Sequence, residues 1–267
     1  MLVVLIVGAG YGLWRSPLGR PARVWYADWQ NQQVLPPEQV AFSIAAPAVN
    51  AVANRYGTNS LPSAALPSAK NLSVPFTTQA PTANWDQDHE EFCEEASMLM
   101  AGRFFQNKKI TNAADAESGL QQLKQWELDH LGWYYDTTAS ENAQVLKGLY
   151  GLQVTQKANP SINDIKLAIA NNELVIVPAA GRELGNPNFK SPGPIYHNLV
   201  IRGYTKDGKF ITNDPGTRKG QGYVYTQSVV MNAIHDWVPS GNRTKPRNGD
   251  VAKGTRVVLV VSLAPAK

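Results

Sequence analysis

The sequence predicts an α+β fold in which helices come first and a mostly antiparallel sheet follows. Three observations lead to this prediction. Four segments between residues 90 and 172 carry apolar side chains at helical spacing. Beyond residue 172, short apolar runs are separated by turn residues, as in strands. The pair Asp207-Gly208, which lies between two apolar runs, is typical of the turn of a β-hairpin.

The four expected helices cover residues 90–106, 116–128, 140–151 and 161–172. The buried face of the first is expected to hold Phe92, Ala96, Leu99, Met100 and Phe104. The start of this helix is open. Asp88 with Glu91 resembles a capping box, which places Cys93 in the second turn, whereas a start nearer Glu91 places it in the first. The third helix is expected to stop at Gly151, and the fourth to be capped by Ser161.

The expected strands follow these helices. They are a buried strand over residues 173–181, a hairpin over 195–216, a short strand over 222–226 and a closing strand over 255–263. A further helix is expected over residues 228–237. Alternating apolar residues at 72–76 predict a short strand that opens the folded domain.

Three regions are expected along the chain. Residues 1–14 are uncharged and mostly apolar, and are read as a signal or anchor segment, with a buried first strand as the alternative. They are shorter than the ~20 residues that span a bilayer. Residues 15–70, rich in Pro, Ala and Ser, are expected to form a linker with one short helix near residues 48–56. Residues 71–267 are expected to form the catalytic domain.

The expected location rests on this N-terminal run. An exposed apolar run would be a liability in a purely soluble protein, which favours a membrane tether or secretion and an extracytoplasmic catalytic domain. Arg15, Arg20 and Arg23 follow the run directly, and the positive-inside bias of such residues argues against export. The sequence therefore predicts an extracytoplasmic domain, and the three arginines are the one feature that argues against this location.

The composition limits the chemistry that the chain can perform. The net charge of +4 gives no indication of nucleic-acid binding. A single cysteine in 267 residues excludes an internal disulfide and a thiolate zinc cluster. That cysteine, Cys93, is a core residue, an incidental surface thiol or a nucleophile. No metal and no organic cofactor are expected, and the protein is expected to be a monomer.

The predicted hairpin brings together two candidate catalytic residues. His197 lies in its first strand, and Asp214 lies at the end of its second. Antiparallel pairing about Asp207-Gly208 would bring these two residues together, so that the carboxylate orients the imidazole and stabilises its protonated form. The missing element is a nucleophile, for which Cys93 is available.

Four motifs carry a resemblance to a known family. The stretches "VPFTTQAP", "CEEAS", "YHNLVIRGY" and "FITNDPGTRKG", spread over residues 71–237, resemble the bacterial papain-like cysteine peptidases similar to the bacteriocin-leader-processing family. The resemblance implies a papain-like fold and a Cys-His-Asp triad formed by Cys93, His197 and Asp214. It also implies an oxyanion glutamine upstream of the nucleophile.

The chain departs from that family at two places. The better-known members have Gly directly after the nucleophile, where this chain has Glu94. Their glutamine lies close before the cysteine, whereas the resemblance selects Gln79, fourteen positions upstream. Gln87, six positions upstream, is the alternative. We favour Gln79 because it ends a strand-like segment, whereas Gln87 would point to solvent beside Asp88.

The acidic residues around Cys93 have two interpretations. Carboxylates at the start of a helix suit its macrodipole. Alternatively, one of them binds a basic group or the amino end of a substrate. Their charge would raise the pKa of the thiol, and we expect a protonated His197 to outweigh them because exposed carboxylates are screened by solvent.

The sequence as a whole favours a cysteine peptidase that cleaves a peptide or protein substrate through a thioester acyl-enzyme. A cell-wall peptide amidase or transpeptidase would use the same chemistry. A catalytically silent member that binds a peptide or wall polymer is the alternative from another class. The aromatic residues Trp85, Trp133, Tyr134 and Tyr135 either line a groove or fill the core, and core positions are expected.

Overall fold

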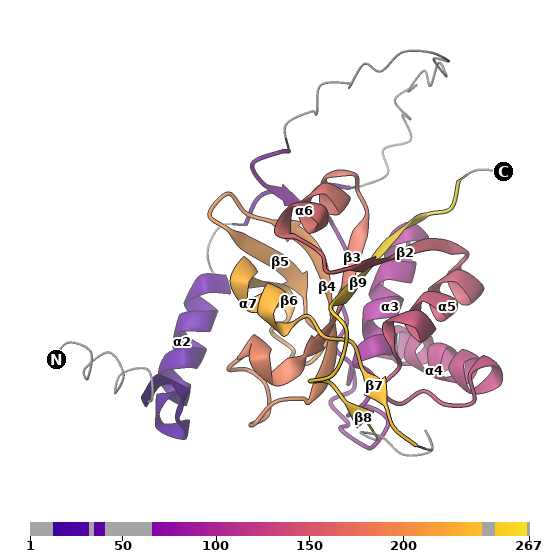
Figure 1. Cartoon of the computed structure of the whole chain (residues 1–267), viewed down its shortest axis with the longest axis horizontal. Coiled ribbons are helices and arrows are strands. Elements are labelled where there is room, and N and C mark those ends of the chain that lie inside the picture. The colour runs from indigo at the N-terminus through magenta and orange to yellow at the C-terminus, as the bar shows by residue number, and fades with distance from the viewer. Residues whose placement is uncertain (1–12, 32–34, 41–65, 242–248, 266–267) are drawn as a thin grey trace, which may run out of the picture.

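A central antiparallel sheet with helices packed around it forms the body of the molecule (Figure 1). The computed structural model describes residues 13–31, 35–40, 66–241 and 249–265 of the 267-residue chain. Three helices lie together at the right of the sheet in Figure 1, and a fourth lies at the far left. The three at the right are α3 (Cys93–Phe105), α4 (Ala113–His130) and α5 (Ala139–Tyr150), and the one at the left is α2 (Arg20–Asn31).

Capping explains where several of these helices begin and end. The expected stop of α5 is confirmed, because Gly151 is in the left-handed conformation at its C-cap (φ 66°). Helix α6 (Ile162–Ala170) is capped by Ser161, as expected, through a capping box with Asp164. Helix α3 begins instead at Cys93, and Phe92 before it provides no side-chain cap.

The start of α3 settles one open expectation. A capping box of Asp88 with Glu91, which would have put Cys93 in the second turn, is wrong. Asp88 is occupied elsewhere, because its carboxylate accepts hydrogen bonds from Lys124 and Tyr134. Residues 87–92 form turns instead of helix, and Cys93 is the first residue of the first turn of α3.

All strand pairs of the main sheet are antiparallel, as expected. The strand order is β2-β9-β3-β4-β5-β6, and β1 pairs with β4 outside this path. The strands are β1 (Lys70–Asn71), β2 (Leu152–Ala158), β3 (Leu174–Ala180), β4 (Tyr196–Tyr204), β5 (Lys209–Asn213), β6 (Gln221–Thr226) and β9 (Val257–Leu263). A separate two-stranded sheet joins β7 (Val238–Pro239) to β8 (Gly249–Asp250).

The predicted hairpin is β4 with β5, and its turn holds Gly208 at φ 80°. A register shift between Ile201 and Gly203 marks a bulge in β4, and beyond it Val200 pairs with Asn213. Gly203 suits this position because a Cβ there would lie 2.4 Å from the carbonyl oxygen of Lys70. Asp214, the residue after Asn213, therefore follows opposite Leu199 of β4.

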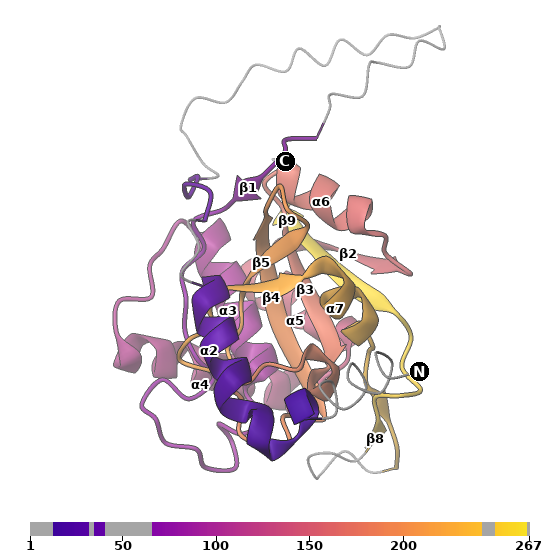
Figure 2. The same ribbon diagram turned by 90° about the vertical axis from the view of Figure 1, so that its left-hand side faces the viewer.

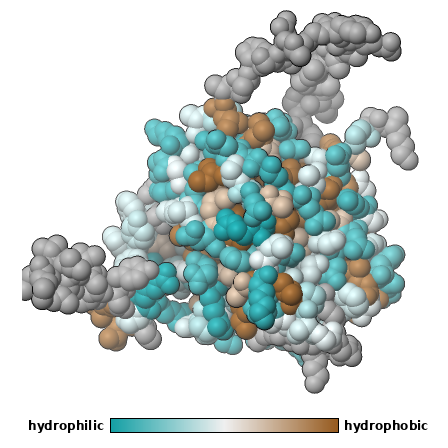
Figure 3. Space-filling model, viewed as in Figure 1, coloured by the Kyte–Doolittle hydropathy of each residue, from teal (hydrophilic) through white to brown (hydrophobic). Residues whose placement is uncertain are grey.

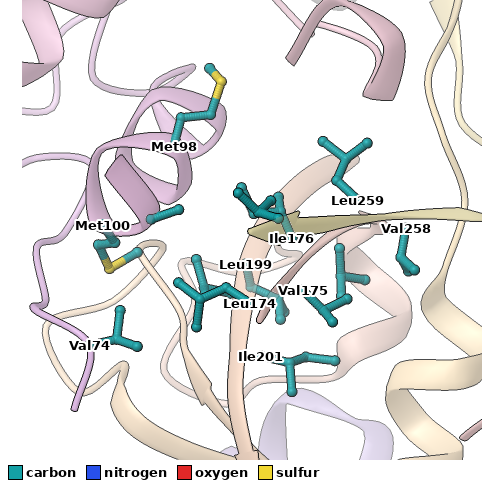
Figure 4. Close-up of a cluster of buried hydrophobic side chains, with 14 of the residues drawn as sticks. Val74, Met98, Met100, Leu174, Val175, Ile176, Leu199, Ile201, Val258 and Leu259 are labelled. Carbon is teal, nitrogen blue, oxygen red and sulfur yellow. The ribbon is translucent and has the colours of Figure 1, made fainter. Parts of the chain in front are cut away.

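The core lies between α3 and the sheet (Figure 4). Met100 of α3 lies beside branched side chains of the sheet, whereas Met98 leaves the helix on another side, and both are buried. The buried side chains of β3, β4 and β9, which point to both faces of the sheet, include Leu174, Val175, Ile176, Leu199, Ile201, Val258 and Leu259. Burying each such side chain contributes roughly 1.5–3 kcal/mol, so this contact fixes α3 against β4.

Two strand predictions needed correction. Strand β2 was not expected, since "LQVTQKA" alternates only weakly, and it forms because it pairs along its length with β9. The strand expected at 72–76 is wrong: the regular strand is Lys70–Asn71, which pairs with β4, and Leu72 forms an isolated bridge with Gln39. Helix α7 (Gln227–Ala233) is shorter than the segment predicted for it.

The N-terminal linker prediction is wrong for part of residues 15–70. Residues 20–31 form the helix α2, which packs beside β6, and Ala27 is buried there. Residues 35–40 also contact the domain, where Glu38 pairs with Arg202 and Gln39 pairs with Leu72. The helix expected near residues 48–56 and the segment 1–12 lie outside the described residues. Within the described part of the chain, no helix has the length and apolarity to cross a membrane.

Candidate active site

Helix α3 places Cys93 at its amino-terminal end, where the first backbone N–H groups have no partner within the helix. The aligned peptide dipoles of a helix favour negative charge at this end, which helps a thiolate form and helps bind an oxyanion. Cys93 itself is buried. The position therefore suits a nucleophile, although burial by itself disfavours the charged thiolate.

His197 and Asp214 form a buried pair across the β4–β5 hairpin. The imidazole Nε2 of His197 lies 2.8 Å from Oδ1 of Asp214, and both side chains are fully buried. The pairing follows from the register: Asn213 pairs with Val200, so Asp214 comes next, opposite Leu199, and His197 is two residues from Leu199 on the same face of β4. A carboxylate in this position fixes the tautomer and the orientation of the ring.

Asp214 is held as a carboxylate by its surroundings. Tyr225 donates a hydrogen bond to it from 2.5 Å, and the amide nitrogens of Asn186 and Gly216 lie 3.3 and 3.0 Å from its oxygens. Burial opposes the charge, but the charge of His197 and these hydrogen bonds outweigh burial and lower the pKa of Asp214 below its ordinary value. The residue is therefore a charge partner for the imidazole.

The motif "NDPG" has a steric role at this pair. A Cβ at Gly216 would lie 2.7 Å from the Phe189 ring and 3.0 Å from Cε1 of His197. The Phe189 ring itself meets the His197 ring edge-on, with centroids 5.2 Å apart. Only glycine at position 216 therefore leaves room for the imidazole of His197, which explains why this motif ends in glycine.

The thiol of Cys93 is directed to Glu94 in this structure. Sγ donates a hydrogen bond to Oε2 of Glu94 at 2.9 Å. Burial, followed by the charge and hydrogen bond of Glu94, raises the pKa of Cys93 well above its ordinary value, and the backbone N–H of Asn198 opposes this. Within the described residues, Nδ1 of His197 has no hydrogen-bond partner. The structure thus joins His197 to Asp214, and holds the thiol beside β4 without a hydrogen bond to His197.

Replacing Glu94 with glutamine is expected to lower the pKa of the Cys93 thiol. The amide keeps the size and an acceptor oxygen but removes the negative charge beside sulfur. The rate of alkylation of Cys93, measured against pH, should shift to lower pH by about one unit. Glu90→Gln, an exposed residue of the loop before α3, is the matched control and should leave the profile in place. An unchanged or higher thiol pKa in Glu94→Gln would contradict this account.

The acidic residues after Cys93 are buried, which overturns the expectation that solvent screens them. Glu94 and Glu95 lie in the first turn of α3, and Glu95 meets Glu127 of α4. Burial raises the pKa of both Glu95 and Glu127 well above the ordinary value. The charge of Glu127 adds to the rise at Glu95, and the charge of Glu94 adds to the rise at Glu127, where contact with Glu95 opposes it.

The two candidate glutamines occupy different environments. The Gln79 side chain is buried, and its amide nitrogen donates to the carbonyl oxygens of His89 at 2.8 Å and Glu90 at 3.2 Å. Its backbone N–H donates to Pro215, next to Asp214. Gln87 is exposed, as expected, and reaches only the Tyr135 hydroxyl at 3.4 Å. The structure therefore brings Gln79, and not Gln87, into the buried loop that precedes Cys93.

The loop before Cys93 depends on a histidine whose partners the sequence did not reveal. The ring of His89 lies 2.6 Å from Asp86 and 2.8 Å from Glu117 of α4. Burial lowers the pKa of His89, and the two carboxylates outweigh burial and raise it. The three-residue spacing of Asp86 and His89 could have indicated the contact between these two side chains. The contact of His89 with Glu117 depends instead on the packing of α4.

The aromatic residues expected in the core have mixed positions. Tyr134 is buried, and its ring packs near Phe92 with centroids 6.0 Å apart. Trp133 and Tyr135 are half-buried, and Trp85 is 48% exposed. Among the residues that the structure describes, no group of three or more His, Cys, Asp or Glu side chains is arranged to hold a metal ion.

A comparison with family models places this fold in a known class, the cysteine peptidases with a papain-like fold. The chain belongs to the Peptidase_C39-like family, whose model matches residues 71–245. A solved structure assigned to the C39-like peptidases, from Bacillus anthracis, is similar, with 13% sequence identity and a TM-score of 0.45. The similarity covers 72% of this chain and 96% of that one. No curated protein matches the sequence.

Proposed function

We propose that this peptidase hydrolyses peptide bonds with a triad of Cys93, His197 and Asp214. The observation that carries the proposal is the fully buried His197–Asp214 pair at 2.8 Å, whose Nδ1 has no partner among the described residues. His197 lies on β4, the strand that packs against α3. The thiol of Cys93 is close to the backbone N–H of Asn198, the next residue of β4. A nucleophile, a base and an orienting carboxylate are the three parts that this reaction needs.

Proton transfer requires the thiol to leave Glu94 and turn toward Nδ1 of His197. His197 then takes the thiol proton, and the thiolate sulfur attacks the carbonyl carbon of the scissile bond. As that C–N bond breaks, His197 returns the proton to the leaving amine, and a thioester remains on Cys93. Water attacks the thioester, His197 takes one of its protons, and the thiol and a carboxylic acid are released.

The tetrahedral intermediate needs donors for its negatively charged oxygen. The backbone N–H of Cys93, at the start of α3, is one candidate donor. The Gln79 amide is the second, and it must release one of its two carbonyl partners, His89 or Glu90, to act. Its buried position next to the loop before Cys93 supports this role.

Gln79→Ala is expected to lower kcat by about 10²–10³, with little change in KM, because the donor acts mainly on the transition state. Gln87→Ala should stay within about threefold of the wild type, because its side chain is exposed and makes one long contact. Steady-state kinetics on a cleaved peptide measure both. The reverse order of effects would assign the oxyanion donor to Gln87.

Hydrolysis can be separated from its two alternatives by one experiment. The protein is incubated with a mixed peptide library and with cell-wall peptides in water enriched in heavy oxygen, and the products are analysed by mass spectrometry. Hydrolysis places one heavy oxygen in the new carboxyl group, whereas transpeptidation joins the acyl group to an amine and incorporates none. A silent binder gives neither product. Absence of any cleaved bond with either substrate set would overturn the proposal.

We also propose an extracytoplasmic location, supported by the uncharged run at residues 1–14. Cell fractionation with antibodies against the full chain measures it. Recovery of the protein with the membrane or the extracellular fraction is expected. Recovery in the cytosolic fraction after gentle cell rupture would refute it.

A further inference from the structure

Helix α2 presents its aromatic side chains to solvent instead of to the protein. Ala27, 4% exposed, is the contact with the domain. Trp25 and Trp29 lie two residues before and after it, which is more than half a helical turn, so both point away from the domain. They are 68% and 48% exposed. A surface helix ordinarily has the opposite arrangement, with polar side chains outward.

The exposed aromatic surface extends beyond these two tryptophans. The Tyr26 ring stacks on Trp29 with centroids 5.7 Å apart, and meets Trp14 edge-on at 5.9 Å. Leu18, in the turn before α2, is 81% exposed. Brown side chains project at the lower left of Figure 3, where Figure 1 places the start of α2. We call Trp14, Leu18, Trp25, Tyr26 and Trp29 the α2 aromatic surface.

The charges around this surface are of one sign. Residues 13–31 contain Arg15, Arg20 and Arg23, and Asp28 is the only acidic residue among them. Asp28 pairs with Lys219 of the domain at 2.7 Å, so its charge is directed inward. Figure 2 shows α2 along the outside of the domain, turned toward the viewer. The outer side of this helix is therefore aromatic, and the segment that carries it has a net positive charge.

We propose that the α2 aromatic surface binds an anionic lipid bilayer, with α2 lying in the plane of the membrane interface. Tryptophan and tyrosine favour this zone because their rings have an apolar body and one polar group. Basic residues add attraction to anionic headgroups. The sequence that leads into this surface, residues 1–14, is uncharged and mostly apolar, which suits a segment next to a bilayer. A second copy of the chain or another protein is a different occupant, and the test below separates them.

Lipid binding through α2 would also determine which side of the catalytic domain faces the bilayer. Lys219, which pairs with Asp28, lies in the loop that follows Asp214, so α2 is joined to the segment next to the His197–Asp214 pair. A bilayer on the outer side of α2 would therefore lie on the same side of the molecule as this loop. This inference concerns lipid binding alone, and it can hold whether or not the triad is active.

Vesicle binding of the full chain tests the proposal. Wild-type protein is mixed with vesicles of phosphatidylcholine, with or without phosphatidylglycerol, and bound protein is measured by sedimentation. Tighter binding to the anionic vesicles is expected. Trp25→Ala/Trp29→Ala should weaken that binding by roughly tenfold or more, because most of the apolar contact is removed. Trp85→Ala, another exposed tryptophan at 48%, is the matched control and should bind like the wild type.

A second variant covers the case in which the alanine variant is poorly folded. Trp14→Phe/Trp25→Phe/Trp29→Phe keeps the apolar contact and should still bind. Fluorescence quenching by brominated lipid should largely disappear, because this variant removes all three tryptophans of the α2 aromatic surface. Three results would overturn the proposal. The first is that the wild type does not bind the vesicles. The second is that folded Trp25→Ala/Trp29→Ala binds them as tightly as the wild type. The third is that light scattering shows a wild-type dimer and a monomeric Trp25→Ala/Trp29→Ala variant.

Discussion

Replacing Cys93 or His197 with alanine is expected to reduce peptide hydrolysis by at least about 10³-fold while the fold is retained. Cys93→Ala removes the only thiol of the chain, so no acyl-enzyme can form. His197→Ala removes the base that draws the proton from that thiol, and leaves Asp214 without its imidazole partner. The two losses should be similar in size, because the residues act as one unit.

The measurement is kcat/KM on any peptide that the wild type cleaves, with circular dichroism as the check on folding. Cys93→Ala removes one sulfur from a helix that Met98 and Met100 anchor in the core, so α3 should keep its place. His130→Ala is the matched control, because this exposed histidine stacks on Trp126 away from the hairpin. Wild-type turnover in Cys93→Ala would contradict the proposed mechanism.

Asp214→Asn is expected to lower kcat by about 10²–10⁴ and to leave KM nearly unchanged. The amide has almost the same size as the carboxylate, but it cannot stabilise the imidazolium by charge. Its NH₂ group can also face Nε2 of His197 as a donor, which would favour the wrong tautomer of the ring. The carboxylate now accepts from Tyr225 and Gly216, so one of these contacts is weakened as well.

Asp207→Asn is the control for this substitution, because Asp207 is exposed in the turn of the same hairpin. It should keep the kcat of the wild type. Thermal unfolding of both variants separates a loss of catalysis from a loss of structure. If folded Asp214→Asn retained the kcat of the wild type, Asp214 would have no part in orienting His197.

The sequence allowed prediction of those parts of the fold that depend on local patterns. The β4–β5 hairpin follows from one Asp-Gly turn between two apolar runs, and its register brings His197 next to Asp214. The ends of α5 and α6 follow from Gly151 and Ser161. Each of these features is set by residues within a few positions of one another.

Features that depend on long-range packing were not predictable in this way. The burial of Glu94 and Glu95 depends on how α3 meets the sheet and α4, which no local pattern records. For the same reason the contact of His89 with Glu117 went unnoticed. Helix α2 was read as linker although its apolar and polar residues separate at helical spacing, so this miss has a different cause: the pattern was present and was not recognised.

Alkylation of Cys93 by iodoacetamide across a range of pH tests the central claim most directly. The chain has one cysteine, so the mass of the intact protein reports labelling of Cys93 alone. Wild-type protein should be labelled at neutral pH, at least about tenfold faster than His197→Ala. The thiol that has turned from Glu94 to His197 forms a thiolate, and the protonated imidazole stabilises it. Equal rates in the two proteins, or labelling of the wild type only above the ordinary thiol pKa of about 8.5, would contradict the claim that His197 activates Cys93.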